Sequence, residues 1–346
     1  MLARIITAAV AIAAVCGCDR RHFFLENLDS LPEAMPLARS AAPPPKVPIF
    51  AGHTGRRLSW RNVWAAVQWA DVVMVGERHD DEAGHRVELS LVREAAALAP
   101  YTAVSMEMLD RDEQPATDAF ARGEITPKQF VGQTGSPGRG FSDRWNDWYQ
   151  PIVEAARDAG RRVVAANAPR RYVKLARKSG YAALRELPEK ERSHFFVPER
   201  ILGGRYARRF RQKMRGHPRG KGAAKTAPRT RPAPASAPAS RHGEPKGRDA
   251  KTTLDVEAMY RAQLLWDSTM AGSVAEALDR GATRVIHLAG AFHIDFDGGT
   301  VQYLLSRRPG LRILTVSMQP AASRTLRQED AGRADIVIYT GAERRE

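Results

Sequence analysis

Short apolar runs alternate with amphipathic stretches along most of this chain. The apolar runs match buried strands, and the stretches with apolar residues at i, i+4 and i+7, such as Trp60, Trp64 and Val67, match helices. The pattern predicts strands at 72–75, 102–106, 162–166, 284–289, 312–317 and 336–339, and helices at 58–69, 87–98, 148–159, 253–278 and 301–306, with a further helical segment around Pro115. Strands that alternate with helices predict one α/β domain with a mostly parallel central sheet, covered by helices on both faces.

Residues 203–252 interrupt this alternation. They contain 15 lysines and arginines against only Glu244 and Asp249, together with a Pro/Ala/Ser tract at 227–240. Because such a composition cannot bury apolar surface, the segment is predicted to be a disordered insertion between two parts of the domain, 48–202 and 253–346.

The basic insertion also accounts for the charge of the chain. The formal net charge is +15, but outside this segment acidic and basic residues nearly balance. We therefore predict no nucleic-acid binding. The insertion is either a solvated loop or a surface attracted to anionic lipid or polymer.

The N-terminus has the pattern of an export signal. Arg4 precedes an apolar stretch at 5–15, which is shorter than the roughly 20 residues that span a bilayer, so residues 1–17 are predicted to be a signal peptide. The only two cysteines of the chain, Cys16 and Cys18, lie here. The sequence from Val15 to Cys18 resembles a bacterial lipobox, which implies that Cys18 is the lipid-modified first residue of the mature protein. The alternative is an ordinary cleaved signal with incidental cysteines.

The residues after Cys18 suit a spacer. The segment 18–47 is irregular and ends in a proline-rich stretch, as expected for a tether between a lipid anchor and a folded domain. The predicted location is the bacterial cell envelope, with the domain attached to a membrane and facing the periplasm or the exterior.

Polar side chains gather where the predicted strands end. Two strands are closed by Gly-x-x-His, at Gly76–His79 and Gly290–His293. In an open parallel sheet, ligands bind beyond the carboxyl ends of the strands, and neighbouring strands lie about 4.8 Å apart. We therefore expect one site built from distant parts of the chain, and its candidates at strand ends are Glu77, His79, Glu107, Asn167, Arg170 and His293.

Two imidazoles and carboxylates in one crevice are typical of a hydrolase. Glu77, His79, Glu107 and His293 could bind Zn or Mn and leave a position open for a water that loses its proton near neutral pH. In such an enzyme Glu77, His79 and His293 would be the catalytic residues, acting on a peptide or an ester. Without metal, His79 could act as the general base.

Several segments, taken in order, resemble the haem-binding uptake lipoproteins of the ChaN type, within the superfamily of Tiki metalloproteases, TraB proteins and erythromycin esterases. The similar segments are 76–79 with His85, 107–114, 148–149, 167–170, 262–267 with Met270 and Ala271, and 289–293. They extend over roughly residues 70 to 300, with the basic insertion as a departure. The resemblance implies haem binding for iron acquisition or haem handling. It also implies relatives that use the same histidines as enzymes.

A haem site needs an apolar slot, an axial ligand and cations for the propionates. The resemblance implies a tyrosine-ligated haem held between two subunits, and hence a homodimer. Tyr260 is the first candidate ligand because it shares a helix face with Gln263, Asp267 and Met270; Tyr149 and Tyr206 follow. The predicted cofactor-binding residues are His79, His85, Glu107, Arg170, Tyr260, Asp267 and His293.

Most of these residues also have structural explanations. Tyr149 could pack with its neighbouring tryptophans, His85 could cap a helix, and Asp267 could be a buried partner of Arg170 or of an N–H group. Arg170 could equally be a surface charge at the edge of a helix. The sequence therefore favours a haem-binding protein over an enzyme, and it leaves a third class, a non-catalytic scaffold.

Overall fold

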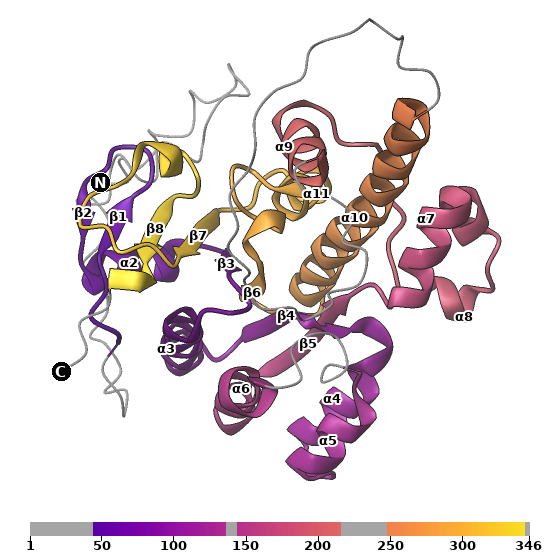
Figure 1. Cartoon of the computed structure of the whole chain (residues 1–346). Coiled ribbons are helices and arrows are strands. Elements are labelled where there is room, and N and C mark those ends of the chain that lie inside the picture. Colours follow the sequence, from indigo (N-terminus) through magenta and orange to yellow (C-terminus); the bar gives the residue numbers. More distant parts are fainter. Residues whose placement is uncertain (1–43, 136–143, 216–247, 343–346) are drawn as a thin grey trace, which may run out of the picture.

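The computed structural model describes residues 44–135, 144–215 and 248–342 (Figure 1). The predicted signal peptide, Cys18 and most of the predicted tether lie outside the described residues, as does the central part of the predicted insertion. Within the described segments, no helix has both the length and the apolar character needed to cross a bilayer.

The core of the domain is a sheet in which eight strands are described, in the order β2-β1-β8-β7-β3-β6-β4-β5. The six strands from β8 to β5 run parallel to their neighbours, while β1 is antiparallel to both β8 and β2. The strands are β1 (Ile49–Ala51), β2 (Arg57–Leu58), β3 (Val72–Glu77), β4 (Thr102–Asp110), β5 (Arg162–Asn167), β6 (Arg284–Gly290), β7 (Ile313–Gln319) and β8 (Ile336–Tyr339). The predicted mostly parallel sheet is confirmed.

Helices cover both faces of this sheet (Figure 1). The α-helices are α2 (Trp60–Trp69), α3 (Glu82–Leu98), α4 (Gln114–Ala121), α5 (Pro127–Gln133), α6 (Gln150–Asp158), α7 (Arg170–Arg185), α8 (Glu189–Arg192), α9 (Gly204–Arg215), α10 (Arg248–Asp279) and α11 (Gly299–Arg307). A π-helical turn, η5 (Trp145–Tyr149), precedes α6, and the short 3-10 turns are η2 (Arg111–Glu113), η6 (Ala291–His293), η7 (Gln328–Asp330) and η8 (Thr340–Ala342).

Alternate residues of each central strand face opposite layers of helices, as the two-residue period of a strand requires. Val73 and Val75 of β3 pack in the cluster that includes α2, α3 and α6. Val72 and Met74 pack in the opposite cluster, with α9, α10 and α11. Because both faces are buried, the strands contain continuous apolar runs.

Helix boundaries follow local capping. The helix predicted from residue 58 begins at Trp60 because Ser59 and Asn62 form a reciprocal capping box there, while Leu58 belongs to β2.

The predicted start of the disordered insertion is wrong. Residues 204–215 form helix α9. Its Tyr206 and Phe210 are buried in the same apolar cluster as residues of α10 and α11. These two residues are one helical turn apart and therefore lie on the same face of the helix. At the other end, residues 248–252 already belong to α10.

The order of the strands decides where the site forms. β6 inserts between β3 and β4, which are consecutive in the chain, so three strand ends from separate segments become neighbours. The register pairs Glu77 of β3 with Gly290 of β6, and Met106 of β4 with Leu288 of β6. The residues that follow these positions therefore meet at one edge of the sheet.

Candidate functional site

A cleft of about 960 Å³ opens at the carboxyl ends of β3 and β6. This volume is at the upper end of the roughly 300–1,000 Å³ typical of sites for small molecules and cofactors. The residues that line it and matter below are His79, His293, Gln263, Phe210, Phe292, Arg78, Arg209, Lys213 and Arg333. Helix α9, which supplies several of them, forms one wall.

His79 presents one ring nitrogen to this cleft. Its Nδ1 makes a short hydrogen bond to Glu77 Oε1, which also accepts a hydrogen bond from the Tyr149 hydroxyl at 2.7 Å. Glu77 is buried, whereas the His79 side chain is 41% exposed. Because a carboxylate holds Nδ1, the neutral ring keeps its proton there and leaves Nε2 as the reactive atom.

The charge on Glu77 controls the protonation of His79. Burial alone would lower the pKa of His79, but the hydrogen bond and charge of Glu77, with weaker contributions from Glu107 and Asp80, raise that pKa to about 9. Burial would likewise raise the pKa of Glu77, and His79 and His85 lower it below its usual range. The two side chains therefore form an ion pair at neutral pH.

His293 is held in the same way by a different carboxylate. Its Nδ1 lies 2.7 Å from Asp267 Oδ1, and Asp267 also accepts hydrogen bonds from the Tyr206 hydroxyl at 2.6 Å and from Thr300 Oγ1 at 3.0 Å. Burial opposes protonation of His293, but Glu107 and Asp267 raise its pKa. Three donors thus converge on one buried carboxylate that orients the imidazole.

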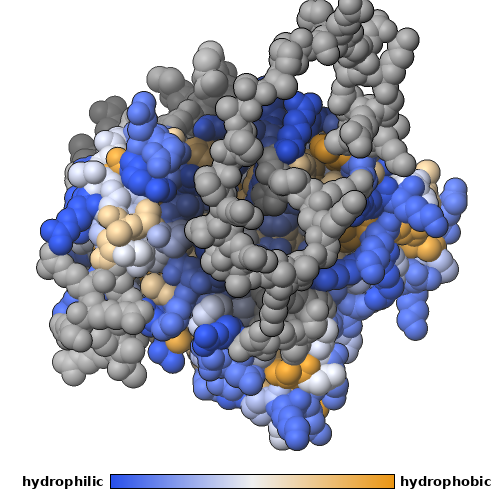
Figure 2. Space-filling model, viewed as in Figure 1, coloured by the Kyte–Doolittle hydropathy of each residue, from blue (hydrophilic) through white to orange (hydrophobic). Residues whose placement is uncertain are grey.

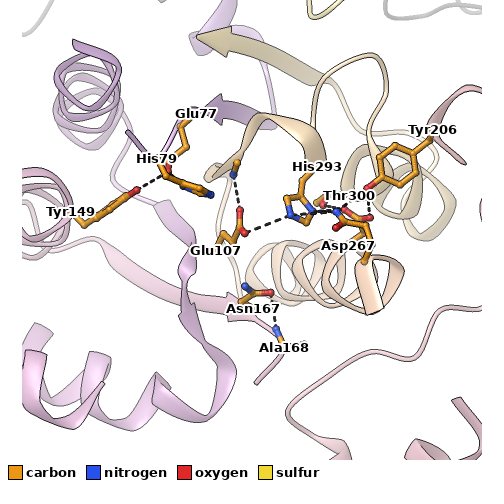
Figure 3. A network of polar contacts seen from close by, with 12 residues as sticks. Glu77, His79, Glu107, Tyr149, Asn167, Ala168, Tyr206, Asp267, His293 and Thr300 are labelled. Atoms are coloured by element: carbon orange, nitrogen blue, oxygen red, sulfur yellow. Dashed lines mark hydrogen bonds and ion pairs between the residues drawn. The ribbon is translucent and has the colours of Figure 1, made fainter. Parts of the chain in front are cut away.

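Glu107 lies between the two imidazoles (Figure 3). The Gly290 N–H donates a hydrogen bond to Glu107 Oε2 at 2.6 Å, and Glu107 Oε1 lies 3.5 Å from His293 Nε2. The pairing of β4 with β5 shifts in register between Met106 and Asp110, so Glu107 lies in an irregular part of the strand. There its side-chain carboxylate, instead of a backbone carbonyl, accepts the hydrogen bond from the Gly290 N–H.

Gly290 is required by this close approach. A Cβ at this position would lie 3.0 Å from His79 Nε2 and 3.5 Å from Glu107 Oε2. The structure therefore brings Glu77, His79, Glu107 and His293 together at adjacent strand ends.

Four other predicted residues do not line the cleft. Arg170 is exposed at the start of α7, and Asn167 accepts a hydrogen bond from the next backbone N–H at 2.9 Å. His85 is buried behind Glu77, stacked on Trp148. Tyr260 is buried, and its hydroxyl donates to the Leu202 carbonyl at 2.8 Å.

Asp267 supports the site through His293 instead of contacting the cleft. Its hydrogen bonds to His293, Tyr206 and Thr300 replace the pairing with Arg170 that was considered from the sequence.

The three candidate tyrosines are poorly suited to bind iron. Among the residues that the structure describes, no tyrosine lines the cleft. Tyr149 and Tyr206 donate to the carboxylates of Glu77 and Asp267, and burial together with those carboxylates raises the pKa of both hydroxyls. The geometry therefore differs from the tyrosine ligation that the family resemblance implies.

Basic side chains of the cleft could not be predicted from the sequence, because α9 has the composition of the disordered insertion. Burial, followed by the nearby charges of Arg78 and Arg209, lowers the pKa of Lys213. The Lys213 ammonium and the Arg209 guanidinium lie 4.8 and 5.2 Å from the centre of the Phe292 ring. Figure 2 shows strongly hydrophilic residues gathered over α9. Mutually repelling cations beside an aromatic ring favour a flat ligand that carries acidic groups.

Comparison with protein families gives one match. Residues 63–304 match the model of the family described as "Haem-binding uptake, Tiki superfamily, ChaN". The chain belongs to this family. The match covers most of the described domain of this ChaN-family chain, including both Gly-x-x-His segments and Glu107.

One solved structure shares the fold of this ChaN-family chain. A structure of ChaN from Campylobacter jejuni, described as showing cofacial haem binding, has 16% sequence identity and a TM-score of 0.58, with 86% of this chain and 97% of that chain covered. The type III effector HopBA1 (12% identity, TM-score 0.43, coverage 86% and 97%) and the erythromycin esterase EreC (14%, 0.38, coverage 78% and 76%) are more distant. No curated protein sequence matches the chain.

Proposed function

We propose that this ChaN-family chain binds haem in the cleft at the carboxyl ends of β3 and β6. The observation that carries this proposal is the His79 imidazole, whose Nδ1 is held by Glu77 and whose ring is half-exposed at the cleft. A histidine that donates its other ring nitrogen to a carboxylate is oriented and made more basic as a metal ligand.

The residues around His79 fit the rest of a haem molecule. Phe210 and Phe292 offer apolar surface, while Arg209 and Lys213 are placed to bind propionates. Haem, when bound, would supply the iron, and Glu77 would hold the proton of the neutral ring on Nδ1, so that Nε2 is the nitrogen left to bind the iron. His293 also lines the cleft, and Glu107, which does not, lies 3.5 Å from its Nε2.

We further propose that the chain is an envelope lipoprotein, anchored to a membrane through Cys18, that takes part in iron acquisition or haem handling. Two copies would associate so that their open clefts enclose haem. Cofacial haem binding is described for the Campylobacter jejuni relative, which supports a homodimer here.

A haemin titration of the purified chain, without the first 17 residues, tests the binding proposal. We expect a saturable shift of the Soret band with about one haem per chain, accompanied by a doubling of the mass in light scattering. A titration with no saturable spectral change would overturn the proposal.

Haem affinity is expected to rise with pH. Ligation needs neutral His79, whose pKa is about 9, so protons compete with iron below that pH. The Kd should fall by roughly tenfold per pH unit from pH 6 to pH 9 and then level off. Asp80 also acts on this ring, and the hydrogen bond and charge of Arg78 lower the pKa of Asp80, so it stays charged over this range. An affinity that is constant or falls across this range would exclude His79 as the ligand.

Replacing Lys213 with glutamine should weaken the binding of haemin by roughly fivefold to tenfold, because one charge-assisted contact with a propionate is lost. The iron complex of protoporphyrin dimethyl ester, which has no free carboxylate, should bind equally well to both proteins. The exposed Lys174 on α7 provides a matched control, Lys174→Gln. Equal sensitivity of haemin and its ester to Lys213→Gln would contradict the assignment.

A second candidate function is supported by the carboxylates that orient both imidazoles. His79 Nε2, Glu107 and His293 converge as they would in a metal-assisted or histidine-based hydrolase of peptides or esters, with Zn or Mn as the metal. Hydrolysis of activated esters by the haem-free chain, abolished in His293→Asn, would favour this function. No hydrolysis above the rate of that variant would exclude it for such esters.

A further inference from the structure

A second group of ionisable side chains lies behind His79, and only one of its three members, Glu77, also lines the cleft. It consists of Glu77 at the end of β3 and of His85 and Glu88 on α3. His85 Nδ1 lies 2.8 Å from Glu88 Oε2 and 3.7 Å from Glu77 Oε2, and ligand atoms of all three residues lie within 4.8 Å of one another. All three side chains are at least 98% buried.

Two carboxylate oxygens in this group have no hydrogen-bond partner among the described residues. They are Glu77 Oε2 and Glu88 Oε1. The other Glu77 oxygen already accepts from His79 and Tyr149. Two buried carboxylates this close together cannot both remain charged without compensation, which either a proton or a bound cation can supply. Burial and the charge of Glu77 raise the pKa of Glu88 well above its usual value when only protein groups are present.

We propose that Glu77, His85 and Glu88 bind one divalent first-row metal ion, with Zn²⁺ or Mn²⁺ as the best matches. Two carboxylates and one imidazole provide ligands of the kinds that these ions accept, and their two negative charges balance a dication. His85 and Glu88 are spaced i, i+3, which places both on one face of α3. Glutamate and histidine at i and i+3, in the reverse order, supply metal ligands in helical carboxylate proteins.

This site differs from a metal site between His79 and His293. Trp148 stacks on His85 with ring centroids 4.6 Å apart, and Tyr149 contacts the same ring edge-on at 4.8 Å, so aromatic side chains enclose the site. Glu77 belongs to both regions: one oxygen faces the cluster and the other holds His79. A metal ion here would fix Glu77, and through it the orientation of His79.

Metal titration of the chelator-treated chain tests this site. Isothermal titration with Zn²⁺ and with Mn²⁺, combined with elemental analysis, should show about one tightly bound ion per chain. Glu88→Gln should weaken this binding by roughly 100-fold or more, because it removes a ligand and its charge. Glu94→Gln is the matched control, since Glu94 is another buried glutamate of α3 outside the cluster. Equal loss in both variants would overturn the proposal.

Further variants separate this site from the cleft. His293→Asn should retain the ion, and loss of the ion in His293→Asn but not in Glu88→Gln would place the metal in the cleft and overturn the proposal. Absence of binding to the unaltered chain would also overturn it, showing that Glu77 and Glu88 share a proton instead. If Glu88→Gln does not fold, anomalous diffraction from Zn²⁺ in the unaltered chain decides: a peak at these three residues supports the proposal, and a peak elsewhere refutes it. Haem binding is measured separately by the Soret band. A chain that fails to bind haem can therefore still be seen to bind or not to bind the metal ion.

Discussion

Replacing His79 with alanine is expected to abolish tight haemin binding at pH 8, weakening it by roughly 100-fold or more. The change removes the exposed imidazole whose Nδ1 is held by Glu77, while the buried core on both faces of the sheet is untouched. The saturable Soret shift should disappear, and the remaining weak binding should lose its dependence on pH because the titrating ligand is gone. Absorbance titration of both proteins measures this difference.

His53→Ala is the matched control for His79→Ala. His53 is also a partly exposed histidine near a carboxylate, with its Nε2 3.8 Å from Asp335, but it does not line the cleft. It should leave the haemin affinity unchanged within twofold or so. An unchanged affinity in His79→Ala, or an equal loss in both variants, would contradict axial ligation by His79.

Replacing Asp267 with alanine is expected to lower the free energy of unfolding by about 3–5 kcal/mol, the range for breaking a buried charged pair. Asp267 is completely buried and accepts hydrogen bonds from His293, Tyr206 and Thr300. Its removal leaves these three donors without their acceptor. Of the two carboxylates near His293, only that of Glu107 then remains. Urea denaturation followed by circular dichroism measures the loss.

Thr300→Val provides the comparison for Asp267→Ala, because it removes only one of the three donors and keeps the shape of the side chain. Its cost should be about 1 kcal/mol. If Asp267→Ala is no more destabilising than Thr300→Val, then Asp267 does not hold this part of the site together.

The main features of the fold were predictable because buried parallel strands have a simple pattern. Runs such as 72–75 and 284–289 are apolar on both faces, and the structure places them in the centre of the sheet. The three-residue β1 and two-residue β2 were missed, since strands of that length have no detectable period. Helix α9 was missed because its apolar positions, Tyr206 and Phe210, are surrounded by basic residues that resemble those of the adjacent low-complexity tract.

The members of the site could be predicted from the sequence only where they lie at or just after the end of a strand. Glu77, His79 and His293 lie close to the strand ends, so the rule for parallel sheets was sufficient to group them. Glu107 was grouped with them as the residue after the predicted strand 102–106, and the structure places it inside β4, at a shift in register between Met106 and Asp110. The role of Asp267 depends on how α10 packs against η6 and α11, and the role of Lys213 depends on α9, so neither could be read from local sequence.

A crystal structure of the chain with bound haemin would locate the haem directly. We expect the porphyrin in the cleft between α9 and the carboxyl ends of β3 and β6, with the iron on His79 Nε2 and a propionate near Lys213. Iron bound to a tyrosine, or a haem outside this cleft, would contradict the claim that the strand-end histidines and Glu107 form the haem site.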